Sequence, residues 1–345
     1  MSLNTALRRG LWLPLFLRLA FALPSNASRD YPLVVVGEFS HPETFENIAT
    51  RHDGQLLLTS AVSSTLYQVC PFKPDQIEGL VDIPETTGLF GIAELEEDVF
   101  YVASANLSST HAVAGSNAVW RVDLRERNRC SRLNETARPE LTPVRVANIT
   151  SARLLNGMCR LAKDNASTLL VADSGGGKIF KVDVHSGSFE VVIEDEALGN
   201  TPTGFQVAVN GIYTHEPYLY FTNLNRGTFG RIPISAATGI LRGPIDVIVP
   251  DLPGDDFILA PDGEKAWVAM NGRNTLVEVD IPRRQARVVV ESGYLASASA
   301  VSLGRTLLDQ GRLYVSSAAV PDSLFDNNGT ATTRGIVVRV DPPNV

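Results

Sequence analysis

The chain has 345 residues, of which 44% are hydrophobic and 20% charged, so it can bury a core and is not a disordered chain. Its formal net charge of −8 argues against nucleic acid or an anionic membrane as a partner, because both favour a basic surface. This length allows two ordinary domains or one large all-β domain.

The first 22 residues have the pattern of a secretory signal peptide. A basic pair, Arg8-Arg9, precedes an apolar run that ends at Ala22, and residues 20–22 fit the small-x-small cleavage pattern. The run is shorter than the about 20 apolar residues that a membrane span needs. We therefore expect cleavage near Ala22, a secreted product and no membrane anchor.

Sequons for N-glycosylation support the same expectation. Six N-x-S/T triplets begin at Asn26, Asn106, Asn134, Asn148, Asn165 and Asn328. Three cysteines also occur, and none of them forms a zinc-binding pattern. We expect a disulfide between Cys70 and Cys130, which follow equivalent strands of neighbouring repeats. Cys159 falls within an inner strand and is expected to be free and buried.

A repeat accounts for nearly all of residues 31–343. Each unit contains a short strand rich in aromatic or β-branched residues, a turn and a second strand. The units are residues 53–70, 97–123, 167–183, 217–233, 262–280 and 310–341. A further strand precedes each hairpin, and an extended apolar run follows most of them. Four strands per unit, at a spacing of about 40–50 residues, predict a six-bladed β-propeller as one domain.

The last unit lacks its fourth strand, and a surplus strand lies at the other end of the chain, over Leu33–Val36. We expect this strand to complete the sixth blade, because a closed ring leaves no blade with a bare edge. The alternative fold is a sandwich or a two-domain all-β protein.

Side chains at the start of each inner strand should meet at the propeller axis. Glu46 and Asp255 each lie eight residues before the glycine of an Asp-Gly turn, and Asn156 takes the matching place in blade three. The corresponding residues elsewhere are expected to be Phe90 in blade two, Thr203 or its neighbour in blade four, and Ser297 or Ser299 in blade six. Two acids and an amide together could bind Ca²⁺, or could act as general acid and base. Turn capping is the simpler role for each acid alone.

These features resemble the senescence-marker protein/gluconolactonase family. The resemblance rests on Glu46, on Asn156-Gly157-Met158, on Asp255 and on the LYVSSA segment of blade six. It implies a propeller with an axial divalent metal held by Glu46 and Asp255, with Asn156 near the substrate, and often lactone hydrolysis. The fourth blade should supply an asparagine ligand. Residues 201–205 read TPTGF there, so an incomplete metal site is expected.

The signal peptide, the sequons and the segment GMCRLAKDNASTLLVADSGGGKIFKVDV resemble the fungal hetero-Diels–Alderases of tropolone-sesquiterpenoid biosynthesis. This implies secondary-metabolite chemistry in which a hydroxymethyl tropolone loses water and the quinone methide joins a humulene-type alkene. We expect the two partners to be held by proximity, with no cofactor, although calcium would suit the axial site.

On this hypothesis, the catalytic residues are Glu46, Asp255 and Asn156. Substrate-binding residues are expected to be Phe90, Met158, Thr203, Phe205 and Ser299, although core packing is the simpler role for the apolar ones. Two other functions remain open: a metal-dependent lactone hydrolase, with Glu46, Asn156 and Asp255 as ligands, and a non-catalytic ligand-binding propeller.

Overall fold

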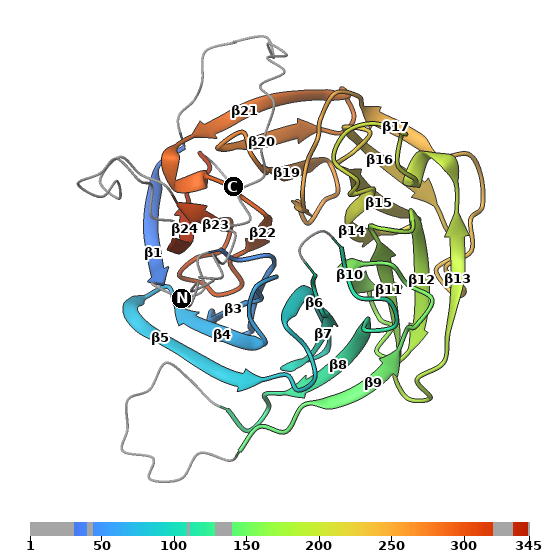
Figure 1. Cartoon of the computed structure of the whole chain (residues 1–345). Helices are drawn as coiled ribbons and strands as arrows, with labels where there is room; N and C mark the ends of the chain where they lie inside the picture. Colours follow the sequence, from blue (N-terminus) through green and yellow to red (C-terminus); the bar gives the residue numbers. More distant parts are fainter. Residues whose placement is uncertain (1–30, 40–43, 109–110, 128–139, 320–333, 344–345) are drawn as a thin grey trace, which may run out of the picture.

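The computed structural model describes residues 31–39, 44–108, 111–127, 140–319 and 334–343. The predicted signal peptide therefore lies outside the described residues. Six four-stranded antiparallel sheets are arranged radially around one axis, as Figure 1 shows. The predicted six-bladed β-propeller is confirmed. No helix in this part of the chain is long and apolar enough to cross a membrane.

Each blade is a meander whose first strand lies nearest the axis (Figure 1). Blade 1 contains β2 (Ile48–Thr50), β3 (Leu56–Leu58), β4 (Thr65–Cys70) and β5 (Lys73–Asp82). Blade 2 contains β6 (Gly88–Glu96), β7 (Val99–Ala105), β8 (Ala118–Asp123) and β9 (Val144–Asn148). Blade 3 contains β10 (Leu155–Arg160), β11 (Thr168–Asp173), β12 (Lys178–Asp183) and β13 (Phe189–Glu194).

The second half of the ring has the same plan. Blade 4 contains β14 (Val209–His215), β15 (Tyr218–Asn223), β16 (Thr228–Pro233) and β17 (Asp246–Val249). Blade 5 contains β18 (Phe257–Leu259), β19 (Lys265–Met270), β20 (Thr275–Asp280) and β21 (Gln285–Glu291). Blade 6 contains β22 (Ala300–Leu303), β23 (Leu313–Ala319), β24 (Arg334–Val340) and β1 (Leu33–Phe39). Two 3₁₀ turns, η1 (Glu196–Leu198) and η2 (Gly293–Leu295), precede blades 4 and 6.

The N-terminal strand closes the ring as predicted. β1 pairs antiparallel with β24 from Leu33 opposite Val340 to Phe39 opposite Gly335, so the pairing extends beyond the predicted Leu33–Val36. β24 also pairs with β23, which gives blade 6 its four strands from the two ends of the chain. Closure covers an edge that would otherwise expose unpaired backbone groups.

Apolar side chains between neighbouring blades form the core. The described residues contain six buried clusters, and each cluster joins two adjacent blades around the ring. Alternation along the strands directs their side chains to both faces of every sheet, so each blade packs on two neighbours. The blades therefore stabilise one another and hold the inner strands in a constant register.

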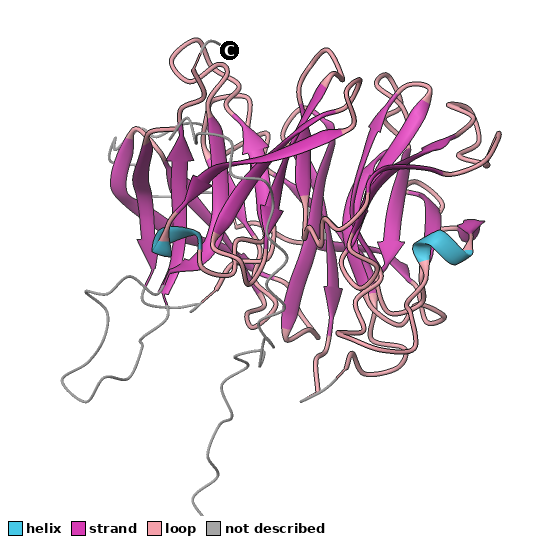
Figure 2. Ribbon diagram, turned by 90° about the horizontal axis from the view of Figure 1, so that it is seen from above, coloured by secondary structure: helices cyan, strands magenta, loops and turns pink. Residues whose placement is uncertain are grey.

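The antiparallel meander places the loops on two opposite faces. In the view of Figure 2 the strands run between these two layers of loops. The first strand of every blade begins on the same face, and the second strand of that blade ends there. We call this the inner-strand face. Segments that precede a first strand, or that join a second strand to a third, therefore lie on it.

Candidate functional site at the propeller axis

Backbone hydrogen bonds between blades define equivalent positions at the axis. The Gly211 amide donates to the Asp255 carbonyl at 3.2 Å, and one blade further the Asp256 amide donates to the Ser299 carbonyl at 2.9 Å. Asp255 and Ser299 therefore occupy equivalent positions, just before the inner strands of blades 5 and 6. Extended around the ring, these places form the axial ring: Glu46, Phe90, Asn156, Asn210, Asp255 and Ser299.

Glycines allow the inner strands of blades 2 to 5 to lie close together. A Cβ on Gly91 would lie 2.2 Å from the Asn156 carbonyl oxygen, and one on Gly157 would lie 2.2 Å from that of Asn210. A side chain at either glycine would push two blades apart. This close approach brings Asn156 and Asn210 to the same level of the axis.

Asp255 lies at the centre of the polar cluster and is only 5% exposed. Its Oδ1 accepts a hydrogen bond from Asn210 Nδ2 at 2.5 Å, and its Oδ2 accepts one from Asn271 Nδ2 at 2.7 Å. Burial raises the pKa of Asp255 well above its usual range, and the nearby Glu46 charge raises it further, whereas the two amide donors oppose the change. The carboxyl group of Asp255 thus favours its protonated form.

Glu46 approaches the same cluster from blade 1. It accepts a side-chain hydrogen bond from Asn156, and its charge acts on Asp255. Burial raises the pKa of Glu46 to about 7; Asn156 opposes this rise, and the charge of Asp256 adds to it. The structure therefore brings together the three predicted catalytic side chains, Glu46, Asn156 and Asp255, and places Glu46 where it can hold or release a proton near neutral pH.

A third carboxyl group, which the sequence did not predict, lies directly beside this cluster. Asp256 Oδ2 accepts a hydrogen bond from Asn47 Nδ2 at 2.7 Å, and its Oδ1 accepts one from the Phe257 amide at 2.7 Å. Burial raises the pKa of Asp256 to about 6, and these donors oppose the change. Asp256 and Asn47 follow Asp255 and Glu46 directly in sequence, so the pair lies one residue deeper along the inner strands.

The fourth-blade prediction was wrong. Thr203 is exposed in the loop before β14, where its carbonyl accepts a hydrogen bond from Asn225 Nδ2 at 2.9 Å. Asn210 holds the axial position instead, because a long segment after η1 precedes the inner strand. The expected gap in the oxygen-donor set is therefore absent. The Asn-Gly-apolar pattern shared by residues 156–158 and 210–212 was the sequence signal that could have found it.

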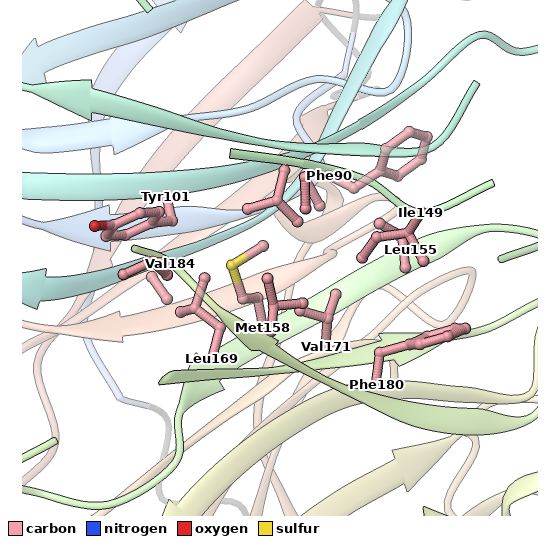
Figure 3. Close-up of a cluster of buried hydrophobic side chains, with 14 of the residues drawn as sticks. Phe90, Tyr101, Ile149, Leu155, Met158, Leu169, Val171, Phe180 and Val184 are labelled. Carbon is pink, nitrogen blue, oxygen red and sulfur yellow. The ribbon is translucent and has the colours of Figure 1, made fainter. Parts of the chain in front are cut away.

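Two predicted substrate-binding residues belong to the core. Phe90 and Met158 are 3% and 6% exposed, and both lie in the apolar cluster between blades 2 and 3. In Figure 3 they lie among residues such as Leu155 and Val171. Their surroundings give them a packing role, because little of either side chain is exposed.

The remaining predicted residues divide between the interior and the surface. Ser299 is 1% exposed, and its hydroxyl donates to the Phe45 carbonyl at 2.9 Å, so it joins blade 6 to blade 1. Phe205 is 48% exposed in the loop before β14, which lies on the inner-strand face. Of the predicted apolar binding residues, only Phe205 is placed where a substrate could contact it.

The donor set is chemically suited to a hard cation. Within the described part of the chain, no three histidine, cysteine, aspartate or glutamate side chains form a metal-binding group by themselves. The two carboxylates, Glu46 and Asp255, would therefore need the amide oxygens of Asn156 and Asn210. Such a set of oxygen ligands is the kind that Ca²⁺ takes. The Asn210 amide would have to turn to present its oxygen, since its nitrogen now faces Asp255.

Cysteine chemistry follows the prediction where the structure describes it. Cys159 is free and buried, and burial raises its pKa to about 12. Cys70 is disulfide-bonded. Its predicted partner, Cys130, lies outside the described residues.

Proteins similar to this chain include one curated relative and several solved structures. No family model matches the chain. A protein of Sarocladium schorii named "Putative hetero-Diels-Alderase asR5" is 27% identical over 231 residues, which cover 61% of this chain and 55% of that protein. The chain thus spans about half the length of this curated relative.

Solved structures share the fold at low identity. A luciferin-regenerating enzyme matches with a TM-score of 0.60 at 14% identity, over 91% of this chain and 96% of that one. A calcium-binding regucalcin from Agrobacterium tumefaciens matches with a TM-score of 0.58 at 15% identity, again over 91% and 96%. These matches confirm the predicted propeller fold. The curated relative confirms the predicted likeness to fungal hetero-Diels–Alderases.

Proposed function

We propose that the protein is a hetero-Diels–Alderase of fungal secondary metabolism that works without a cofactor. Its substrates would be a hydroxymethyl tropolone and a humulene-type sesquiterpene alkene. The observation that carries this proposal is the pair of axial carboxyl groups, the partly buried Glu46 and the buried Asp255, whose raised pKa values favour protonation near neutral pH. Likeness to the curated relative supports the reaction class.

In the first step, an axial carboxyl group donates its proton to the hydroxyl of the tropolone's hydroxymethyl group. The C–O bond breaks and water leaves, while the ring hydroxyl of the tropolone returns a proton to the carboxylate. The product is a quinone methide, and the enzyme regains its starting protonation state. Glu46 is the better candidate for this proton, because a general acid works best when its pKa lies near the working pH.

In the second step, the oxygen and the terminal carbon of the quinone methide add across one double bond of the alkene. One C–C and one C–O bond form together, and no proton moves. Holding both partners face to face supplies the acceleration, through orientation rather than acid or base chemistry. Asn156 supports the first step as a positioning residue, because its side chain holds Glu46.

Apolar side chains on the inner-strand face suit such a substrate. Four exposed residues lie in segments of that face, from blades 1, 2, 4 and 6: Val62, Val113, Phe205 and Tyr294. Exposed apolar groups around a polar centre are typical of sites that bind apolar ligands with a few oriented polar contacts.

The test is product formation from the hydroxymethyl tropolone and humulene-type alkene, followed by mass spectrometry. The parent protein should yield the adduct of the two substrates minus one water. Glu46→Gln and Asp255→Asn should slow water loss by about 10²–10⁴-fold, the usual contribution of a general acid. A preformed quinone methide should restore the adduct in both variants. Adduct formation at the uncatalysed rate would exclude the proposal.

A second function, a metal-dependent lactone hydrolase, is favoured by Asn210. Its place beside Asp255 completes the donor set of two carboxylates and two amides. A bound Ca²⁺ would polarise the lactone carbonyl and lower the pKa of a bound water. Glu46, Asn156, Asn210 and Asp255 would hold the ion. Calorimetric titration with calcium, and lactone turnover with and without a chelator, separates this function from the first.

We also propose that the protein is secreted and N-glycosylated. Asn148 is exposed at the end of β9, the outermost strand of blade 2, and Asn165 is partly exposed in the turn between β10 and β11. The disulfide at Cys70 suits an oxidising compartment. Removal of glycans by an endoglycosidase should lower the mass of the secreted protein.

A further inference from the structure

The hydrogen bond between Asn47 and Asp256 joins blades that are not neighbours. Asn47 precedes β2 in blade 1, Asp256 precedes β18 in blade 5, and blade 6 lies between them in the ring. The contact, 2.7 Å from Asn47 Nδ2 to Asp256 Oδ2, therefore crosses part of the axis. It lies one residue deeper than the axial ring.

The Asp256 carboxyl group is central to the ring at this level. Its Oδ1 would lie 2.2 Å from a Cβ on Gly211 of blade 4, so it fills the space that this glycine leaves. Its charge also acts on Glu46 of blade 1 and on Cys159 of blade 3. Asp256 thus contacts blades 1 and 4 from its own place in blade 5, and its charge reaches blade 3, as expected of a side chain near the axis.

Both partners are held rigidly. The side-chain oxygen of Asn47, Oδ1, accepts a hydrogen bond from the backbone N–H of Ile48 at 2.9 Å. The backbone N–H of Asn47 donates to Thr59 Oγ1 at 3.0 Å. On the other side, the Phe257 amide donates to Asp256 Oδ1 at 2.7 Å. Each side chain is therefore oriented by its own blade before the two meet, and the bridge has few ways to relax.

We propose that Asn47 and Asp256 form an axial floor that closes the propeller axis below Glu46 and Asp255. The floor bounds the axial ring on the side away from the inner-strand face, and it sets the depth to which a substrate can enter. Asn47 and Asp256 are therefore specificity-determining residues. The proposal takes the axial ring as the substrate site, as in the proposed function, but it does not depend on which reaction occurs there.

Cys159 offers a probe of this closure. It lies on β10, three residues after the axial Asn156, and is 6% exposed. Its thiol packs in the apolar cluster between blades 3 and 4. Cys159 also lies two residues further along the inner strand than the axial floor, so a reagent that enters along the axis from the inner-strand face reaches this thiol after the floor. The rate at which Cys159 is modified in the folded protein therefore reports whether the floor is closed.

The experiment compares the parent with Asn47→Ala, Asp256→Ala and the control Asp256→Asn. The asparagine control keeps the size of the side chain and an oxygen that can accept from Asn47. Each protein is treated with methyl methanethiosulfonate, and in parallel with a bulky polyethylene-glycol maleimide. Modification of Cys159 is followed by peptide mass spectrometry, with no substrate present.

We expect the small reagent to modify Cys159 about 10- to 100-fold faster in both alanine variants, the range that corresponds to loss of one hydrogen bond to a charged group. The parent and Asp256→Asn should both react slowly, and the bulky reagent should remain slow with all four proteins. Unchanged rates in the alanine variants would overturn the proposal. Faster reaction with both reagents would also overturn it, because that result indicates general loosening of the blades. Neither outcome depends on turnover, so failure of this proposal can be distinguished from failure of the proposed function.

Discussion

Asn210 Nδ2 donates a hydrogen bond to Asp255 Oδ1 at 2.5 Å, which links the first strand of blade 4 to that of blade 5. Both residues are buried, so neither can exchange this contact for water at low cost. The link holds Asp255 toward the axis, where it meets the charge of Glu46. The site is therefore a cluster of coupled side chains from several blades.

Loss of the Asn210 amide should destabilise the protein. In Asn210→Ala, the buried Asp255 loses one of its two side-chain donors, and we expect the free energy of unfolding to fall by about 1–3 kcal/mol. Denaturant titration measures the change. Asn225→Ala is the matched control, because Asn225 Nδ2 donates to loop carbonyls at an exposed site. This substitution should lower the free energy of unfolding by less. Equal losses in the two variants would contradict a special role for the axial contact.

The rate of water loss should fall as the pH rises through about 7. Burial raises the pKa of Glu46 to about 7, so the protonated general acid predominates below that pH and is depleted above it. Initial rates of adduct formation between pH 5.5 and 8.5, a range of about 1.5 units either side of that pKa, test this. With a preformed quinone methide the fall should vanish, because cycloaddition moves no proton. If the rate with a preformed quinone methide still fell as the pH rose, the titrating group would act in a step other than water loss.

The buried ion pair on the opposite face should be sensitive to truncation. Arg51 Nη2 lies 2.8 Å from Asp98 Oδ2, and both side chains are at most 3% exposed. Asp98→Ala leaves a buried guanidinium without its counter-ion, so we expect a loss of about 3–5 kcal/mol in denaturant titration. Asp123→Ala is the control, because Asp123 pairs with Arg121 and Arg125 at a partly exposed site. A smaller loss of unfolding free energy in Asp98→Ala than in Asp123→Ala would contradict the expected role of the buried ion pair.

The same pair predicts an acid-sensitive contribution to stability. Burial alone would raise the pKa of Asp98, but the hydrogen bonds and charges of Arg51 and His52 outweigh burial and lower this pKa below its usual value. Stability from such a depressed carboxyl group is present above its unfolded-state pKa and is lost as the pH falls through the folded-state value. The difference in unfolding free energy between the parent and Asp98→Ala should therefore shrink at acid pH. A difference that grows on acidification would show that the ion pair is not its source.

Ring closure predicts a large effect of removing β1. Deleting residues 31–38 exposes the edge of β24, so the melting temperature should fall and the protein should become prone to aggregation. Calorimetry and light scattering measure both effects. Val34→Ala provides the control, because this side chain is 43% exposed and its loss leaves the strand pairing intact. An unchanged melting temperature in the deletion variant would refute closure as the source of stability.

The sequence alone predicts the fold, because blade architecture is a local and repeated property. Alternating apolar strands, turn residues and a fixed spacing recur along the chain, and the missing fourth strand of blade 6 indicates closure by Leu33–Val36. Glu46, Asn156 and Asp255 could be predicted for the same reason. The Asp-Gly turns that set the register are regular, with Gly54 and Gly263 at φ values of +86° and +72° that favour glycine.

The tertiary structure alone decided which residues meet. Asn210 was missed because a long segment before β14 breaks the count from the repeat, and only the hydrogen bonds between blades restore the register. Phe90 and Met158 face the neighbouring blade, since blade packing rather than chain order directs their side chains. The Asn47–Asp256 contact spans 209 residues and two non-adjacent blades, so no local pattern encodes it. A repeat determines each blade, whereas contacts at the axis depend on how six blades close around it.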